Sequence, residues 1–229
     1  MKASNRVLFI GRKNDFWSKK IFYYLKKKFK NVEVFYSSKY FEKAPKKIKN
    51  WKGDYILSFR SYLILSKKTI NNAKEAAINF HPGPPEYRGI GCLNYAMYNG
   101  ENKYGVTAHL MSQKIDNGKI LKVQRFRIKK EMNLDAALKL THKKLYEITI
   151  NFIDKILSGK VRKKLISNYS MKYEWSKSIK SLKDLNDFYE IKKNISAIDL
   201  FKKIRATYTK KFKPYVIIHN KKFIFDDEK

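Results

Sequence analysis

Residues 78–91, INFHPGPPEYRGIG, hold three of the chain's five prolines and three of its nine glycines. The segment starts inside an apolar run, 76–80, and carries two polar residues, Asn79 and His81, two positions apart. Side chains two apart on a strand lie on the same face, so we expect this pair to point together. The prolines that follow end the strand, and the glycines allow turns that other residues avoid. The sequence therefore predicts a strand that ends in a rigid wall beside two polar side chains.

Stretches typical of strands and of helices alternate on both sides of this wall. The predicted strands are 6–11, 31–37, 54–59, 76–80, 105–111 and 119–128, and the predicted helices are 15–29, 93–100 and 134–160. Such alternation predicts an α/β fold with an open, mostly parallel, doubly wound (Rossmann-like) sheet. Ligands of these sheets bind beyond the carboxyl ends of the strands, and the Pro/Gly segment follows one of those ends.

The character of the chain changes near residue 160. We expect residues 1–160 to form the main domain and residues 161–229 to form a small C-terminal appendage. Within the appendage, residues 195–208 read as a helix, and residues 214–225 read as a β-hairpin that turns at HNKK. The appendage is too short to be a second full domain.

Composition limits the class of protein. The chain has 229 residues, of which 43% are hydrophobic and 15% aromatic, which predicts a folded domain with a substantial core. It has no apolar run long enough to span a membrane, and the N-terminal apolar run is too short for a signal peptide. The single cysteine, Cys92, excludes an internal disulfide and a cysteine-based metal cluster. We therefore expect a cytoplasmic protein with no metal.

The formal net charge of +32 invites a nucleic-acid interpretation. However, only eight of the 52 basic residues are Arg, and the Lys residues are spread along the whole chain. Lys, Asn, Ile, Phe and Tyr are the residues that A/T-rich codons favour, so genome bias is a sufficient cause. Nucleic acid is not an expected partner, whereas attraction to small anionic substrates is. The first βα turn, GRKNDFW, lacks a GxGxxG fingerprint, which argues against a nicotinamide dinucleotide.

Three polar residues form the candidate catalytic set: Asn79, His81 and Asp116. Asp116 lies in KIDNGKI, between two predicted strands, and a parallel neighbouring strand would bring it beside His81. His81 could exchange a proton, Asp116 could hold its ring, and Asn79 could donate to an oxyanion. This set suits acyl transfer to a nucleophile supplied by the substrate. The alternatives are a histidine that caps a backbone carbonyl and an aspartate that only forms a turn.

The segment from Ile78 to Leu121 resembles the core of the folate-dependent formyltransferases. The motifs that carry the resemblance are Asn79-Phe80-His81-Pro82, Tyr87-Arg88-Gly89, Gly105-Val106-Thr107 and Ile115-Asp116-Asn117-Gly118. With the preceding strands, the resemblance covers about residues 5 to 155. It implies that 10-formyltetrahydrofolate is the formyl donor and that an amine of the acceptor attacks the formyl carbon. Asn79 and His81 would stabilise the oxyanion, and His81 with Asp116 would manage proton transfer.

The same resemblance implies where the donor binds. Its pterin ring would lie against Leu63, Ile64 and Leu65 and against the loop that begins at Met111. His109 has a counterpart in some family members and could support the catalytic set or pack in the core.

The tail IRATYTKKFKPYVIIHNKKFIF resembles that of the sugar N-formyltransferases, whose hairpin commonly pairs in a homodimer. This branch implies an amino-dideoxy sugar linked to a nucleoside diphosphate such as dTDP, for the biosynthesis of lipopolysaccharide (O-antigen type). Tyr87, Arg88 and Arg205 are the candidate substrate-binding residues, with packing or solvated surface as the alternative interpretation.

Other functions stay open. A methionyl-tRNA formyltransferase-like enzyme is favoured by the charge, but the tail looks too short for that enzyme's β-barrel domain. Glycinamide ribonucleotide as acceptor would call for a Gly-rich first turn, which is absent. A non-catalytic folate-binding relative would not need all three polar residues. A folate hydrolase would carry an additional N-terminal domain. The sequence names neither the sugar and the position of its amine nor the nucleotide.

Overall fold

A computed structural model describes residues 1–166 and 173–226, and a six-stranded sheet forms its centre. In spatial order the strands are β2 (Phe29–Ser37), β1 (Ala3–Arg12), β3 (Gly53–Phe59), β4 (Ala73–His81), β6 (Lys103–Leu110) and β7 (Ile120–Arg127). The first four are parallel to one another, whereas β6 is antiparallel to both β4 and β7. The predicted fold class is confirmed. The expectation of a parallel strand between His81 and Asp116 was wrong, because β6 runs in the opposite direction.

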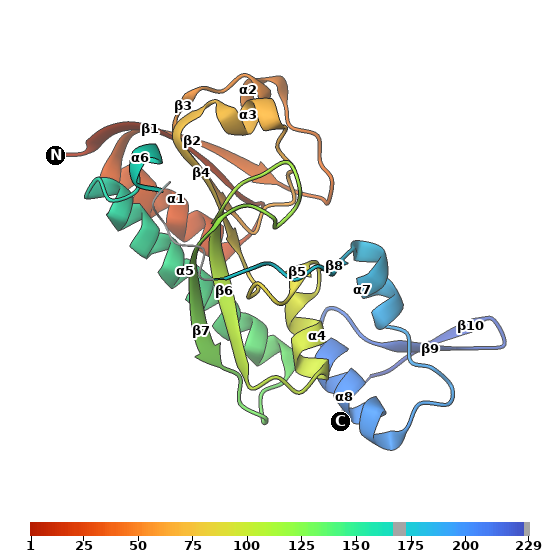
Figure 1. The fold of residues 1–229 in the computed structure, drawn as a ribbon. Helices are drawn as coiled ribbons and strands as arrows, with labels where there is room; N and C mark the ends of the chain where they lie inside the picture. Colours follow the sequence, from red (N-terminus) through yellow and green to blue (C-terminus); the bar gives the residue numbers. More distant parts are fainter. Residues whose placement is uncertain (167–172, 227–229) are drawn as a thin grey trace.

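Helices cover both faces of the sheet. They are α1 (Phe16–Lys28), α2 (Lys46–Lys49), α3 (Lys67–Asn71), α5 (Leu134–Leu157) and α6 (Lys163–Ile166). Figure 1 shows α1 and α5 along one face, and α2 and α3 on the other. Alternate residues of β1 explain this, because Val7 and Phe9 join the cluster with α1 and α5, while Leu8 and Ile10 join the cluster with α2.

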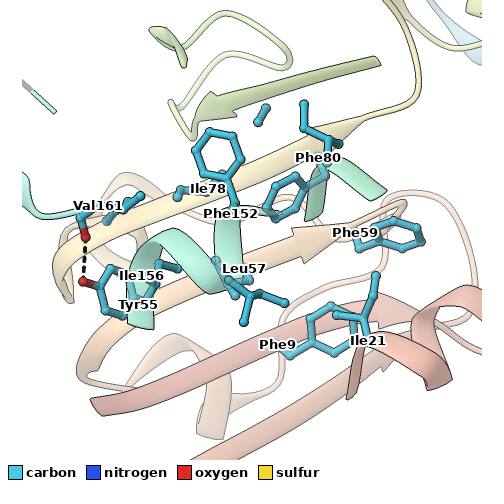
Figure 2. Packing of buried hydrophobic residues seen from close by; sticks show 14 of the residues in the cluster. Phe9, Ile21, Tyr55, Leu57, Phe59, Ile78, Phe80, Phe152, Ile156 and Val161 are labelled. Atoms are coloured by element: carbon cyan, nitrogen blue, oxygen red, sulfur yellow. Dashed lines mark hydrogen bonds between the residues drawn. The ribbon is translucent and has the colours of Figure 1, made fainter. Parts of the chain in front are cut away.

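The larger core cluster lies between the sheet and the long helix α5 (Figure 2). The rings of Phe80 and Phe152 meet edge to face, with their centroids 5.9 Å apart. The hydroxyl of Tyr55 donates to the backbone carbonyl of Val161 at 2.7 Å, so this buried polar group is satisfied. The core thus fixes β4, the strand that carries Asn79 and His81.

Truncation of this core should be costly. We expect Phe152→Ala to lower the free energy of unfolding by about 3–5 kcal/mol, because it leaves a cavity between α5 and the sheet. Urea unfolding followed by circular dichroism measures the change. Phe212→Ala is the matched control, since that ring is largely exposed. A loss below about 1 kcal/mol would mean that the core closes around the cavity.

The C-terminal part packs beside α4 (Cys92–Tyr98) and not on the sheet (Figure 1). It contains β8 (Ile179–Lys180), α7 (Leu182–Phe188), α8 (Ala197–Thr207), β9 (Tyr215–Ile218) and β10 (Lys221–Ile224). The predicted helix and hairpin are both present, and the hairpin turns at His219 and Asn220, whose φ angles are 47° and 60°. The division of the chain into a main domain, residues 1–160, and a small C-terminal appendage, residues 161–229, remains a prediction.

Two short strands, of two residues each, join this part to the Pro/Gly segment, residues 78–91. Strand β8 runs parallel to β5 (Arg88–Gly89), and the amide of Ile90 donates to the carbonyl of Lys180 at 2.8 Å. Gly89 has a φ of +86°, and a Cβ there would lie 2.1 Å from that same carbonyl oxygen. Only glycine therefore allows the two segments to approach. Within the described ranges, no helix is both long and apolar enough to cross a bilayer.

Candidate active site

The three predicted catalytic residues meet at the carboxyl end of β4. Asn79 and His81 end that strand, and the neighbouring strand β6 places His109 opposite Asn79. Residues 111–119 lead from β6 to β7 and bring Asp116 back to His81. Asp116 thus lies beside His81 as expected, but the antiparallel strand β6 and the loop that follows it bring it there.

One buried carboxylate lies between two histidines and an amide. Asp116 Oδ2 is 3.2 Å from His81 Nδ1, and Asp116 Oδ1 is 3.5 Å from His109 Nε2. The amide nitrogen of Asn79 is 3.4 Å from Asp116 Oδ1 and 3.1 Å from His109 Nε2. His81 is 3% exposed, His109 2% and Asp116 7%. Interactions between these groups are strong because little water screens them.

Both ring nitrogens of His81 face acceptors. Nδ1 faces the Asp116 carboxylate, and Nε2 lies 3.0 Å from the carbonyl oxygen of Tyr87. A carbonyl can only accept, so Nε2 carries a proton, and the carboxylate favours a proton on Nδ1 as well. Burial lowers the pKa of His81, but the charge of Asp116 and the adjacent Cys92 outweigh it and raise the pKa to about 9. His81 is therefore an imidazolium at neutral pH.

The partner carboxylate is correspondingly ionised. Burial alone would raise the pKa of Asp116, yet the charge of His81 and the contact with His109 lower it to about 2. The backbone amide of Gly89 adds a hydrogen bond to Asp116 Oδ2 at 3.1 Å. The cluster thus places a cation and an amide side by side at the end of β4, the kinds of group that stabilise a developing oxyanion in acyl transfer.

His109 belongs to this set and is not merely core packing. Its Nδ1 is 2.7 Å from the carbonyl oxygen of Leu110 and therefore donates to it. Its Nε2 lies 3.1 Å from the amide nitrogen of Asn79 and 3.5 Å from Asp116 Oδ1, so it contacts both of these side chains. His109 thereby fixes the orientation of the Asn79 side chain.

Three of the four residues expected to hold the pterin ring belong to, or pack against, one core cluster. Leu63 and Leu65 are buried in one core cluster, and Met111 packs against it. The amide of Met111 also donates to the carbonyl of Ala77 in β4 at 2.8 Å. Ile64, between the two buried leucines, is 45% exposed, and its contact with the pterin ring stays a prediction.

The expected substrate-binding residues do not all lie at this cluster. The hydroxyl of Tyr87 donates to Glu101 and accepts from Asn99. Arg205, on α8, donates to backbone carbonyls where α8 meets the rest of the chain. Arg88 donates to backbone carbonyls near Asp116. Substrate contacts of all three stay predictions, and the observed contacts favour structural roles for the two arginines.

A second polar cluster, at the ends of β1 and β3, was not predicted from the sequence. Arg60 pairs with Asp15, and Arg12 donates from Nε to the carbonyl of Arg60 at 3.1 Å. The Arg12 guanidinium lies 4.0 Å from the centroid of the Tyr62 ring. Burial, followed by the charges of Arg60 and Arg12, lowers the pKa of His142 to about 3, so that ring is neutral. The Asp15 carboxylate thus pairs with Arg60, whereas the Arg12 guanidinium contacts the Arg60 carbonyl and the Tyr62 ring.

The sequence did carry a signal for this cluster. Arg is rare in this chain, and Arg12 and Arg60 each directly follow a predicted parallel strand. The chain order reverses between β1 and β3 in the sheet, and ligands of doubly wound sheets bind at such a reversal.

Trp175 is the other residue that the sequence did not indicate. Its ring contacts His109 and His81 edge to face, with centroid distances of 5.0 and 5.8 Å. Its Nε1 donates to the carbonyl of Gly118 at 2.7 Å. Within residues 1–166 and 173–226, no group of three or more His, Cys, Asp or Glu side chains is arranged to hold a metal ion.

Comparison with known sequences agrees with the resemblance. Residues 8–153 match the family model described as Formyl transferase. Over 116 residues, 50% of this chain, the sequence is 33% identical to the methionyl-tRNA formyltransferase of Clostridium novyi (strain NT), of which it covers 38%. Over 165 residues, 66% of this chain, it is 34% identical to the bifunctional polymyxin resistance protein ArnA of Wigglesworthia glossinidia brevipalpis, of which it covers 23%. The chain thus spans well under half the length of these curated relatives.

Solved structures share the fold over nearly the whole chain. A sugar N-formyltransferase from Shewanella sp. FDAARGOS_354 has a TM-score of 0.73 at 17% identity, with 96% of each chain covered. A 4-N formyltransferase from Francisella tularensis has a TM-score of 0.72 at 22% identity, again with 96% of each chain covered. An N-formyltransferase from Helicobacter canadensis, solved with folinic acid and dTDP-3-aminofucose, has a TM-score of 0.73 at 18% identity and covers 94% of this chain and 84% of its own. Since the family model matches more than half of the sequence, this chain belongs to the formyl transferase family.

Proposed function

We propose that the protein is a sugar N-formyltransferase that moves a formyl group from 10-formyltetrahydrofolate to the amine of a nucleotide-linked amino sugar. The observation that carries the proposal is the buried cluster of Asn79, His81 and Asp116 at the carboxyl end of β4, inside the region matched by the family model. The cytoplasm, where folates and nucleotide sugars are available, is the proposed location.

Each residue of the cluster has a role in this proposal. His81 would exchange its hydrogen bond to the Tyr87 carbonyl, and Asn79 its hydrogen bond to Asp116, for hydrogen bonds to the formyl oxygen as it becomes negative. Asp116 keeps His81 charged and, with His81, would manage the proton that the attacking amine must lose. His109 orients the Asn79 amide.

The donor fits the loops around the cluster. Leu63 and Leu65 anchor one loop in the core, and Met111 anchors the other beside it. Ile64, between the two leucines in sequence, is exposed and would offer an apolar contact for a flat ring. When bound, 10-formyltetrahydrofolate would supply the formyl group, and these residues would hold its pterin ring.

A nucleotide sugar fits the charged cluster at the same edge of the sheet. Ile10 pairs with Ser58 and Ser58 pairs with Asn79, so Arg12, Arg60 and His81, each two residues further along the chain, lie at the same edge of the sheet. Neighbouring strands are about 4.8 Å apart, so the backbones of β1 and β4 are roughly 10 Å apart. That separation suits a diphosphate held by Arg12 while the sugar amine reaches the formyl carbon. The Helicobacter canadensis neighbour, bound to dTDP-3-aminofucose, makes this class of acceptor the first to test.

The proposal also covers the use of the product and the oligomeric state of the protein. The product would serve surface polysaccharide biosynthesis of the O-antigen type. The hairpin β9–β10 would pair with a second copy in a homodimer, since its apolar side chains Phe223 and Ile224 are exposed in a single chain.

The first experiment is an acceptor screen by mass spectrometry. The protein and 10-formyltetrahydrofolate are incubated with dTDP-, GDP- and UDP-linked 3-amino and 4-amino sugars, and separately with methionyl initiator tRNA. We expect one nucleotide sugar to gain the mass of one formyl group while the tRNA remains unchanged. Formylation of the tRNA alone would overturn the sugar assignment. That rival is favoured by the Clostridium novyi relative and by the net charge of +32.

The diphosphate assignment has its own test. We expect Arg12→Ala to raise KM for the nucleotide sugar by about 10- to 100-fold, the scale of one charge-assisted hydrogen bond, with a smaller change in kcat. Arg6→Ala is the control, because Arg6 forms a partly exposed pair with Glu33 at the opposite end of β1. Initial rates at varied acceptor concentration measure the effect. An unchanged KM in the Arg12 variant would place the diphosphate elsewhere.

A further inference from the structure

Asp116 occupies a left-handed backbone conformation, which Asp adopts more readily than most residues with a side chain. Its φ angle is +43°, in the left-handed region that residues with a side chain seldom adopt. From this conformation its carboxylate reaches both His81 and the amide of Gly89. An uncommon backbone conformation persists where neighbouring groups hold it, and residues next to Asp116 make such contacts.

Two side chains hold the chain on both sides of Asp116. Arg88 donates from Nη2 to the carbonyl of Ile115 at 3.0 Å and to the Asn117 side-chain oxygen at 3.2 Å. Trp175 donates to the carbonyl of Gly118 at 2.7 Å. Ile115, Asn117 and Gly118 therefore each accept a hydrogen bond from one of these two side chains.

The two holding side chains also support each other. Arg88 donates from Nη1 to the carbonyl of Ser176 at 2.8 Å, and its guanidinium lies 6.0 Å from the centroid of the Trp175 ring. The amide of Ser176 in turn donates to the carbonyl of Pro85 at 2.9 Å. The segment that carries Trp175 is thus attached to the Pro/Gly wall that carries Arg88.

The same indole limits the movement of the histidines. Its ring lies against the edges of both His81 and His109, the two rings between which the Asp116 carboxylate is placed. Loss of the indole would free both the 115–118 loop and the two rings.

We propose that Arg88 and Trp175 are positioning residues that hold the 115–118 loop so that the Asp116 carboxylate lies between His81 and His109. Neither needs to touch a substrate for this role. The effect on rate rests on the formyl transfer proposed above, whereas the effect on the His81–Asp116 pair does not.

The test is an NMR titration of the His81 ring in the wild type and in variants, with His81→Asn used for assignment. Trp175→Phe keeps the ring but loses the donor to Gly118, and Trp175→Ala loses both. Arg88→Lys keeps the charge but loses the forked contact, and Arg88→Met loses both. The ionisable groups that face His81 are Asp116, His109 and Cys92, and the Arg88 charge lies beyond Trp175.

We expect the His81 pKa to fall by about one unit or more in Trp175→Ala and Arg88→Met, because its carboxylate partner moves away. The fall should be smaller in Trp175→Phe and Arg88→Lys, which fold with the least disturbance. Removal of the nearby Arg88 cation alone would raise this pKa, so a fall in Arg88→Met identifies the loop. Arg125→Met is the matched control, since Arg125 contacts Glu86 and Tyr173 beside the same segment and is not among the contacts of the 115–118 loop.

Kinetics separate positioning from substrate binding. We expect kcat to fall about 10-fold in Trp175→Ala and Arg88→Met, with KM for donor and acceptor within about twofold of the wild type. An unchanged His81 titration in the folded variants would overturn the proposal, as would an equal shift in Arg125→Met. A raised acceptor KM in Arg88→Lys with an unchanged titration would also overturn it and would make Arg88 a substrate ligand. If no acceptor is formylated by the wild type, the proposed function fails, yet the titration still decides the positioning role.

Discussion

Replacement of His81 by Asn lowers kcat by about two to three orders of magnitude, the scale for loss of one oxyanion donor or acid/base group. Asn is uncharged, so it cannot supply the cation that His81 places beside Asp116. The substitution also leaves the Asp116 carboxylate buried without its main counter-charge, which destabilises the fold. Initial rates at saturating donor and acceptor measure the catalytic effect, and thermal unfolding confirms that the variant is folded at the assay temperature.

His219→Asn is the matched control for this experiment. His219 is exposed at the turn of the β9–β10 hairpin with a φ of 47°, a conformation that Asn accepts readily. We expect this variant to keep the wild-type kcat. Asn79→Ala should reduce kcat on the same scale as His81→Asn, because it removes the second donor. Turnover close to wild type in both cluster variants would contradict the assignment of this cluster as catalytic.

The central sheet could be predicted because its strands are continuous apolar runs. Residues 54–59 and 76–80 are buried on both faces, and such runs alternating with amphipathic helices have few other interpretations. The hairpin was predictable for a local reason, since His219 and Asn220 suit a tight turn between two short apolar stretches. The strand direction of β6 was not, because residues 82–102, which connect β4 to β6, contain the helix α4, and a connection with a helix usually joins parallel strands.

The site was predictable only where its residues share a local pattern. Asn79 and His81 lie on one strand, and two residues are enough to show their common face. The roles of Arg88 and Trp175 depend on contacts between segments nearly ninety residues apart, as the Arg88–Ser176 bond shows. The strands that join those segments, β5 and β8, have two residues each and carry no periodic signal. Arg12 and Arg60 are separated by 48 residues and become neighbours only through the order of β1 and β3.

The charge of His81 also sets an expected pH dependence. A histidine whose pKa is raised to about 9 by a carboxylate keeps its ion pair at lower pH and loses it as the pH rises through about 9. Asp116, with its pKa lowered to about 2, would release the pair only in strong acid. We therefore expect kcat to stay level on the alkaline side of neutrality and to fall above about pH 9 as His81 loses its proton.

Asp116→Asn should remove this plateau and most of the activity together. Asn has the shape of Asp without its charge, so burial is no longer outweighed, and the pKa of His81 falls below its ordinary value near 6.5. His81 is then neutral at pH 7.5, and we expect kcat to fall by about a hundredfold while donor binding stays close to normal. The decline in kcat with rising pH should move from about pH 9 to below neutrality.

Rates from pH 5 to 10, with donor binding followed by fluorescence quenching, measure both effects. Glu131→Gln, a charge-neutralising change at an exposed position, is the control and should keep the wild-type profile. An unchanged kcat with the decline still near pH 9 would mean that Asp116 only shapes the turn and that another group charges His81. A lower kcat with an unchanged pH profile would separate the two roles. In that case Asp116 would accept the amine proton, while the Tyr87 carbonyl and Cys92, which face Nε2 of His81, would stabilise the charged ring.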